Sequence, residues 1–177
     1  IPRIEALTDY ASGTTVNVGL VEGGSAKNTV PESASCVIDA RFGTMEGADQ
    51  VVAALNEIAE RPFEGMDNVK DHLRQATARL EGRVSRPPME PSAENQGLRE
   101  VYEDYAGAVG LKVGEAPLQG GGSDANLLAG FGVPTVDGLG PFGKFFHSPK
   151  EWSSLSSLRK RTKALACFLV EGIDRLQ

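Results

Sequence analysis

The chain has 177 residues, of which 40% are hydrophobic, 24% charged and 6% aromatic, and this ordinary globular usage excludes a disordered or fibrous protein. The 18 Lys and Arg against 24 Asp and Glu give a net charge of −6, and no basic cluster is long enough to neutralise a row of phosphates, so we expect no nucleic-acid partner. No apolar run approaches the roughly 20 residues of a membrane helix, so we expect no membrane partner. Cys36 and Cys167 lie far apart in apolar segments and are expected to be buried thiols.

Hydrophobic periodicity predicts an α+β unit in the first half of the chain. Apolar and polar residues alternate over 14–22 and again over 34–42, which predicts two half-buried strands joined by a hairpin-like loop. An apolar stripe at helical spacing predicts a helix over 46–60 that Pro62 ends. Alternation over 72–84 predicts another strand, so we expect the order strand–strand–helix–strand with antiparallel pairing.

Three prolines within residues 85–92 mark the clearest boundary, because proline is excluded from helix interiors and central strands. We therefore expect one domain over 1–85 and another over 86–177. The second domain alternates helices with short apolar strands, which is typical of an α/β architecture with parallel pairing. In chain order the predicted elements are a helix over 93–109, a strand near 111–117, a short helix through 127–129, a strand over 132–140 and a long final helix. Ser153 or Ser154 caps this last helix, and its apolar stripe consists of Leu155, Leu158, Thr162, Leu165 and Leu169.

Two strands are too few for a freestanding sheet, so we expect the second domain to form one end of a larger sheet. The chain also begins at Ile1 with neither a methionine nor a signal peptide. Both observations lead us to expect a piece of a longer protein. Any targeting signal at the true N-terminus is then out of view, and a cytoplasmic location is favoured.

Two polar features of the second half are candidates for chemistry. His147 follows a predicted strand and a Gly-Pro-Phe-Gly loop, so its imidazole fits a metal ligand, an acid–base group or a packing residue. Spacing alone favours packing, because one histidine cannot hold zinc. The run Gly120-Gly121-Gly122-Ser123-Asp124 opens a helix and fits either an anion site or a tight turn. It lacks the lysine of a nucleotide-binding loop, so nucleotide binding ranks last among the functions considered.

Two further residues are uninformative by themselves. Arg86 precedes Pro87 and Pro88, whose stiff backbone would hold a guanidinium for a carboxylate, although a solvated linker arginine is the commoner case. Asn28 lies at the predicted hairpin tip, where asparagine usually bonds its own backbone.

Four segments, taken together and in order, resemble one family across nearly the whole chain. Residues 28–41 resemble its Asn-x-x-Pro followed by a strand ending Asp-x-Arg, and 120–125 resemble its Gly-Gly-Gly-(Thr/Ser)-Asp-Ala helix start. Residues 133–152 resemble its Pro…Gly…His…Glu-(Tyr/Trp) end, and Arg86-Pro87 resembles an Arg-Pro of one branch. The family is the dinuclear zinc exopeptidases and amidohydrolases of the glutamate carboxypeptidase, aminoacylase and desuccinylase type.

The resemblance implies an α/β fold in two parts. Residues 1–85 would be the second half of a lid domain, an α+β remnant whose antiparallel sheet carries helices on one face and mediates dimerisation. Residues 86–177 would be the α/β last third of the catalytic domain, at the end of the zinc-peptidase sheet. The resemblance further implies that the intact enzyme holds two zinc ions and that His147 is the last of their five protein ligands. Arg86 and Asn28 would receive the substrate carboxylate, and Gly121, Gly122 and Ser123 would line the pocket.

The leading hypothesis is therefore a fragment of a zinc-dependent metallopeptidase or amidohydrolase that acts on small peptides or N-acyl amino acids. We expect no catalytic residue in the fragment and no activity from it alone, because the general base and the other zinc ligands belong to the segment that precedes it in the family. We expect a homodimer through the lid, or association with that missing N-terminal segment. The alternative is a non-catalytic dimerisation or binding module.

Overall fold

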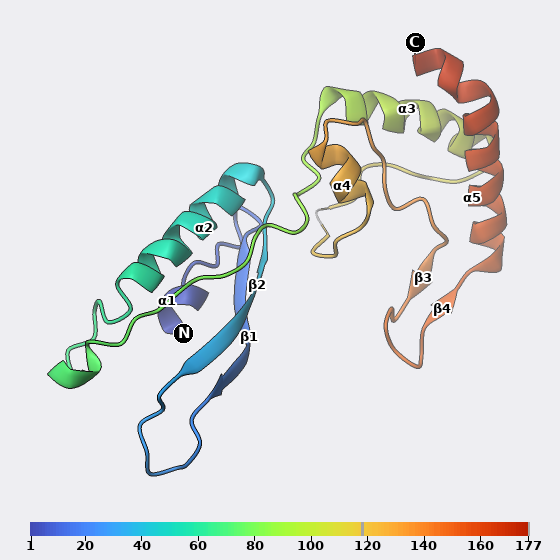
Figure 1. The fold of residues 1–177 in the computed structure, drawn as a ribbon. Helices are drawn as coiled ribbons and strands as arrows, with labels where there is room; N and C mark the ends of the chain where they lie inside the picture. Colours follow the sequence, from blue (N-terminus) through green and yellow to red (C-terminus); the bar gives the residue numbers. More distant parts are fainter. Residues whose placement is uncertain (118, 177) are drawn as a thin grey trace. The chain divides into compact units, whose positions relative to one another are not determined.

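The computed structural model describes residues 1–117 and 119–176, and the chain divides into two compact units, Ile1–Pro88 (unit 1) and Met89–Gln177 (unit 2) (Figure 1). Each unit has a hydrophobic core of its own. The secondary structure is a mixture of helices and small antiparallel sheets, so the fold is α+β in character.

Unit 1 is a β-hairpin with a helix packed along it (Figure 1). Its elements are α1 (Pro2–Glu5), β1 (Thr15–Gly23), β2 (Ala34–Arg41), α2 (Met45–Glu60) and the short 3-10 turn η1 (Asp71–Leu73). β1 and β2 pair antiparallel, with Thr15 opposite Arg41 and Gly23 opposite Ala34, and the register shifts between Val18 and Leu20. The two predicted strands, their hairpin and the predicted helix are thus confirmed.

The third strand predicted for the first half is wrong. The backbone of 72–84 is described throughout, and no strand forms there; residues 71–73 make the 3-10 turn, 74–75 continue as a turn, and 76–84 form no ladder. The alternating residues Ala76 and Ala78 are exposed, and only Leu80 packs on the core of unit 1. Alanine buries too little apolar area to hold a strand in place by its side chains alone.

The core of unit 1 lies between β1, β2 and one face of α2. Val16, Val51 and Leu55 are buried in it, and partly buried apolar residues surround them: Ile4, Leu7, Ile38, Ala40, Phe42 and Leu80. The Thr44 hydroxyl accepts the N–H of Gly47 at 3.1 Å and caps α2. The Thr8 hydroxyl bonds both the N–H and the carbonyl of Val16, which ties the chain after α1 to the start of β1.

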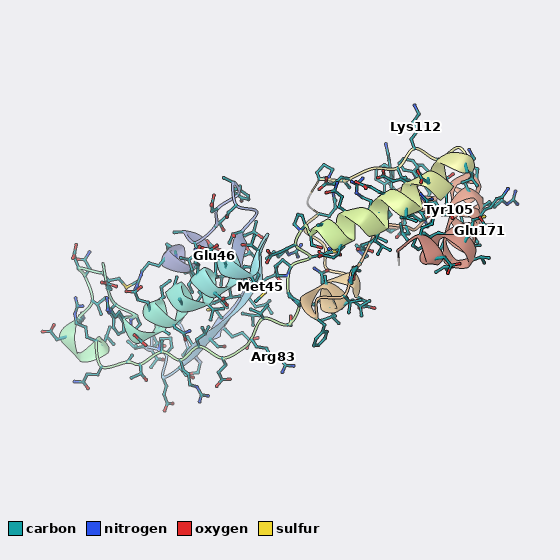
Figure 2. The ribbon with its side chains drawn as sticks, turned by 90° about the horizontal axis from the view of Figure 1, so that it is seen from above. Met45, Glu46, Arg83, Tyr105, Lys112 and Glu171 are labelled. Atoms are coloured by element: carbon teal, nitrogen blue, oxygen red, sulfur yellow. The ribbon has the colours of Figure 1, made fainter. Side chains whose placement is uncertain are left out.

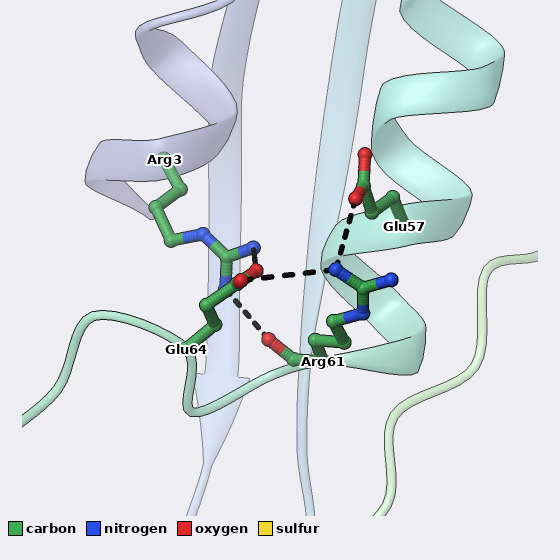
Figure 3. Close-up of polar contacts among 4 residues, drawn as sticks. All are labelled: Arg3, Glu57, Arg61 and Glu64. Atoms are coloured by element: carbon green, nitrogen blue, oxygen red, sulfur yellow. Dashed lines mark hydrogen bonds and ion pairs between the residues drawn. The ribbon is translucent and has the colours of Figure 1, made fainter.

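A group of four charged residues joins α1 to the end of α2 (Figure 3). Arg3 donates to the carbonyl of Arg61 at 2.7 Å and pairs with Glu64 at 3.3 Å. Arg61 in turn lies 3.2 Å from Glu57 and 3.7 Å from Glu64. Exposed pairs of this kind contribute about 0–1 kcal/mol each, so the group orients α1 more than it stabilises unit 1.

Unit 2 is built on two long helices and a small hairpin. Its elements are α3 (Ala93–Ala108), α4 (Ala125–Gly130), β3 (Gly143–Lys144), β4 (Trp152–Ser153), α5 (Leu155–Cys167), the π-helical turn η2 (Phe168–Gly172) and the 3-10 turn η3 (Ile173–Leu176). All three predicted helices are confirmed, and the Ser154 hydroxyl caps α5 by accepting the N–H of Ser157 at 3.2 Å.

The two strands predicted near 111–117 and 132–140 are wrong, and so is the parallel pairing expected between them. Within the described residues of unit 2 the only ladder is the antiparallel pair β3–β4, which was not predicted. In the second segment the backbone is bonded by side chains instead of by a neighbouring strand. Asn95 accepts the N–H of Thr135 at 2.7 Å, and Arg161 donates to the carbonyl of Gly138 at 2.9 Å.

The core of unit 2 lies where α3 crosses α5 and η2. Tyr102, Ala106, Ala164 and Phe168 are buried there. The Phe168 ring meets Tyr102 edge-on at 5.9 Å and Tyr105 at 6.4 Å, which is favourable aromatic geometry. Figure 2 labels Tyr105 on α3 and Glu171 on η2, the two elements that share this core.

The apolar stripe predicted for the last helix is only partly correct. Leu165 packs on the core, but Leu155, Leu158 and Leu169 are exposed, and the buried face is formed by Ala164 and Phe168. Small alanines allow α3 and α5 to approach closely. Because alanine contributes little to a hydrophobic pattern, the sequence did not mark this face as the buried one. The expectation of buried thiols is also wrong for Cys36, which is exposed on β2, while Cys167 is half-buried.

Candidate functional site

The six residues singled out from the sequence are divided between the two units. Asn28 and Arg86 belong to unit 1, and Gly121, Gly122, Ser123 and His147 belong to unit 2. Asn28 is exposed in the loop between β1 and β2, in a turn where the N–H of Thr29 bonds the carbonyl of Ala26 at 3.4 Å. Arg86 is exposed in a non-regular segment, directly before the half-buried Pro87 and Pro88.

The glycine-rich run leads into α4. Gly121 and Gly122 are exposed, and a Cβ added at Gly121 meets nothing within 4 Å, so neither crowding nor a positive φ requires glycine there. Ser123 is half-buried and closes the turn: its N–H donates to the side chain of Asn126 at 2.8 Å, and its hydroxyl accepts the N–H of Ala125 at 3.1 Å. Ser123 thus bonds the first turn of α4, while Asp124 occupies the N-cap position without a capping side-chain bond.

His147 lies on a tight loop, residues 145–151, between β3 and β4. Its side chain is exposed, and its N–H donates to the carboxylate of Glu151 at 3.2 Å. His147 and Phe145 have φ of 63° and 62°, the left-handed region that non-glycine residues rarely adopt. Packing, the role that spacing alone favoured, does not describe an exposed imidazole.

The base of this loop is anchored to the first turn of α5. The N–H of Phe142 donates to the hydroxyl of Ser157 at 3.0 Å, and the N–H of Ser154 donates to the carbonyl of Phe142 at 2.8 Å. The Phe142 and Trp152 rings meet edge-on at 5.6 Å. A Cβ on Gly143 would come within 2.5 Å of the Trp152 carbonyl, so this position needs glycine.

Asn95 and Arg161, which hold the segment leading to this loop, were missed by sequence reasoning. Asn95 bonds Thr135, 40 positions away, and Thr135 is buried. Arg161 bonds Gly138, 23 positions away. Neither residue belongs to a recognisable short motif, and such contacts over long sequence separations leave no periodic signal.

The described residues do not by themselves make a zinc site. No three His, Cys, Asp or Glu side chains among them gather closely enough to hold a metal ion. Catalytic zinc takes three protein ligands in addition to its water or substrate, so His147 alone does not fit the ion. A surface hollow of about 740 Å³ along α3 includes Glu94, Glu100 and Asp104, but none of the six predicted site residues lines it. In the part of the chain that is described, no helix combines the length and apolarity needed to cross a bilayer.

Comparison with known proteins identifies relatives over nearly the whole chain. Residues 2–67 match the peptidase dimerisation domain of the M20 type. The chain is 25% identical to carboxypeptidase G2 of Pseudomonas sp. (strain RS-16) over 96% of its length, and 28% identical to the uncharacterized protein YqjE of Bacillus subtilis (strain 168) over 90%. The crystal structure of aminopeptidase PepT from Bacillus cereus superposes with a TM-score of 0.68 over 86% of the chain, at 28% identity.

The chain spans only about two fifths of the length of these relatives. It covers 39% of carboxypeptidase G2, 40% of YqjE and 38% of the PepT chain. The match to the dimerisation domain lies wholly within unit 1, and the longer matches extend through unit 2.

Proposed function

We propose that the chain is the C-terminal part of a zinc-dependent exopeptidase or amidohydrolase of the M20 type, a proposal supported by the dimerisation-domain match and by the similarity to known peptidases. Its substrates are small peptides or N-acyl amino acids, and the reaction is hydrolysis of an amide bond. The observation that carries the proposal is the match to carboxypeptidase G2 over 96% of the chain, through both units. Two units of this kind correspond to the second half of a lid domain and to the end of a catalytic domain.

In the proposed enzyme this chain binds substrate and does not carry out the hydrolytic step. Arg86 and Asn28 receive the terminal carboxylate of the substrate, Arg86 through the two parallel N–H groups of its guanidinium. Gly121, Gly122 and Ser123 line the pocket, which is supported by the exposure of both glycines and by the open space around Gly121, where local packing does not require glycine. His147 supplies one imidazole to a zinc centre. In the proposal the remaining ligands and the general base lie outside residues 1–177; among the described residues no three His, Cys, Asp or Glu side chains gather to hold a metal ion.

A hydrolysis assay tests whether this chain needs the rest of the proposed enzyme for the hydrolytic step. The purified 177-residue chain, incubated with zinc and an N-acyl glutamate, should release no free amino acid. The longer gene product that contains the chain should release it, and a zinc chelator should stop the reaction. Zinc-dependent turnover by the pure 177-residue chain would contradict the proposal. Absence of turnover from the longer product as well would favour the alternative, a non-catalytic dimerisation module.

We also propose that unit 1 forms a homodimer. Residues 2–67 match a dimerisation domain, and the distal half of the hairpin, beyond the core of unit 1, exposes the apolar Leu20, Val21 and Val37. The hairpin is a two-stranded sheet, so within the described part of the chain each strand has one edge that pairs with no other strand. An exposed edge that carries apolar side chains readily pairs with another chain.

Light scattering coupled to size-exclusion chromatography tests the dimer. The chain should elute with twice its monomer mass. A double variant, Leu20→Lys with Val37→Lys, places like charges on the exposed hairpin and should shift the mass to that of a monomer. Val170→Lys, at a still more exposed site in unit 2, should not. A wild-type chain that stays monomeric at high concentration would contradict this part of the proposal.

A further inference from the structure

The loop that carries His147 holds two residues in a strained backbone conformation. Both Phe145 and His147 are left-handed, and neither is glycine. A Cβ crowds the backbone in this region, so such residues persist only where surrounding contacts hold them. Contacts within or around the loop must therefore hold Phe145 and His147 in this conformation.

Each left-handed residue is bonded by one polar side chain of the same loop. The Ser148 hydroxyl donates to the carbonyl of Phe145 at 2.6 Å and accepts the N–H of Lys150 at 3.3 Å. The Glu151 carboxylate accepts the N–H of His147 at 3.2 Å. The N–H of Glu151 donates to the carbonyl of Ser148 at 3.0 Å, so Glu151 is bonded to the loop from both its backbone and its side chain.

The ends of the loop are fixed as well, so these bonds act within a closed frame. Gly143 pairs with Ser153 and Lys144 with Trp152 across β3 and β4. The hairpin is tied to α5 through the bonds that Phe142 makes with Ser154 and Ser157. Inside this frame, the conformation of residue 147 depends on the bond that its N–H makes.

We propose that Glu151 is a positioning residue for His147. Its carboxylate holds the backbone of His147 in the left-handed conformation and so sets the direction in which the exposed imidazole leaves the loop. A charged acceptor makes a stronger hydrogen bond than a neutral one, which favours a carboxylate at this position. The direction of the imidazole matters for function only if His147 is the zinc ligand of the proposed function. The hydrogen bond and its effect on the backbone do not depend on that proposal.

Nuclear magnetic resonance of the full 177-residue chain tests the proposal. Two readouts report on residue 147 alone: the exchange rate of its amide proton with solvent, and the coupling between its amide and α protons, which depends on φ. Glu151→Ala should speed exchange at this amide on the order of tenfold and change the coupling, because the acceptor is lost. Glu151→Gln keeps a neutral acceptor and should restore a large part of both.

Two controls make the outcome specific. Lys150→Ala alters the neighbouring charged side chain, while the loop bond of Lys150 is made by its backbone, so it should leave residue 147 unchanged. The amides of α5 should exchange at the wild-type rate in every variant. Unchanged exchange and coupling at 147 in Glu151→Ala, an equal effect from Lys150→Ala, or no rescue by Glu151→Gln would each overturn the proposal. These measurements need no enzymatic activity, so a failure of the proposed hydrolase function would leave their result intact.

Discussion

Replacing Phe168 by alanine should destabilise unit 2 by about 3–5 kcal/mol, the cost of removing a large aromatic side chain from a packed core. Phe168 is 6% exposed and packs edge-on against both Tyr102 and Tyr105. The remaining core residues around it include Ala106 and Ala164, which are too small to move into the space. Because whole domains are stable by only 5–15 kcal/mol, this variant should lose a large part of the stability of unit 2 and unfold at a clearly lower urea concentration.

The fluorescence of Trp152 allows the unfolding of unit 2 to be measured separately. Trp152 is the only tryptophan of the chain and lies in unit 2, so its fluorescence during urea unfolding reports on that unit without a contribution from unit 1. Leu169→Ala is the matched control, since Leu169 follows Phe168 directly but is 54% exposed, and its loss should cost less than about 1 kcal/mol. Similar midpoint shifts for the two variants would show that the core of unit 2 is not centred on Phe168.

In the longer enzyme that we propose, Arg86→Ala should lower kcat/KM for substrates with a free terminal carboxylate by an amount equivalent to about 2–5 kcal/mol, or roughly 30-fold and more. The reason is that the substrate carboxylate would enter a closed site without its cationic partner. An amidated analogue of the same substrate has no such charge and should lose much less. The comparison of the two substrates separates a carboxylate receptor from a residue that supports the fold.

Two further variants sharpen the test of Arg86. Arg83, labelled in Figure 2, is an exposed arginine three residues earlier, and Arg83→Ala should leave kcat/KM for both substrates within a factor of about two. Arg86→Lys keeps the charge but not the planar pair of N–H donors, so it should give an intermediate loss with the free carboxylate. If Arg86→Ala slowed the free and amidated substrates by the same factor, Arg86 would be a structural residue at the end of unit 1.

Local signals in the sequence were sufficient for the β1–β2 hairpin and for the three main helices. Alternation over 14–22 and 34–42 matches a hairpin because one face packs on α2, and Ser154 caps α5 through an interaction with its own first turn. These features depend on neighbours in the chain or on a single buried face. The order of the four family motifs is also a property of the sequence, and the M20 dimerisation-domain match and the similarity to known peptidases agree with the resemblance that it indicated.

Other features were decided only by tertiary structure. Residues 111–117 and 132–140 look like strands, but an extended segment becomes a strand only when another backbone pairs with it, and in the described structure the bonds to 132–140 come from Asn95 and Arg161. The buried face of α5 is likewise set by close approach to α3 at Ala106 and Ala164, which hydrophobic spacing does not mark.

The sequence by itself singled out His147 as a candidate for chemistry, and the tertiary structure decided how its loop is held. The motif that ends in Glu151 and Trp152 could be recognised from residue types alone. The left-handed backbone of His147 and its bond to Glu151 could not, because backbone dihedrals in an irregular loop depend on the β3–β4 frame and its attachment to α5. The identity of each residue in the His147 loop follows from the sequence, whereas the direction of its side chain follows from how the loop is packed.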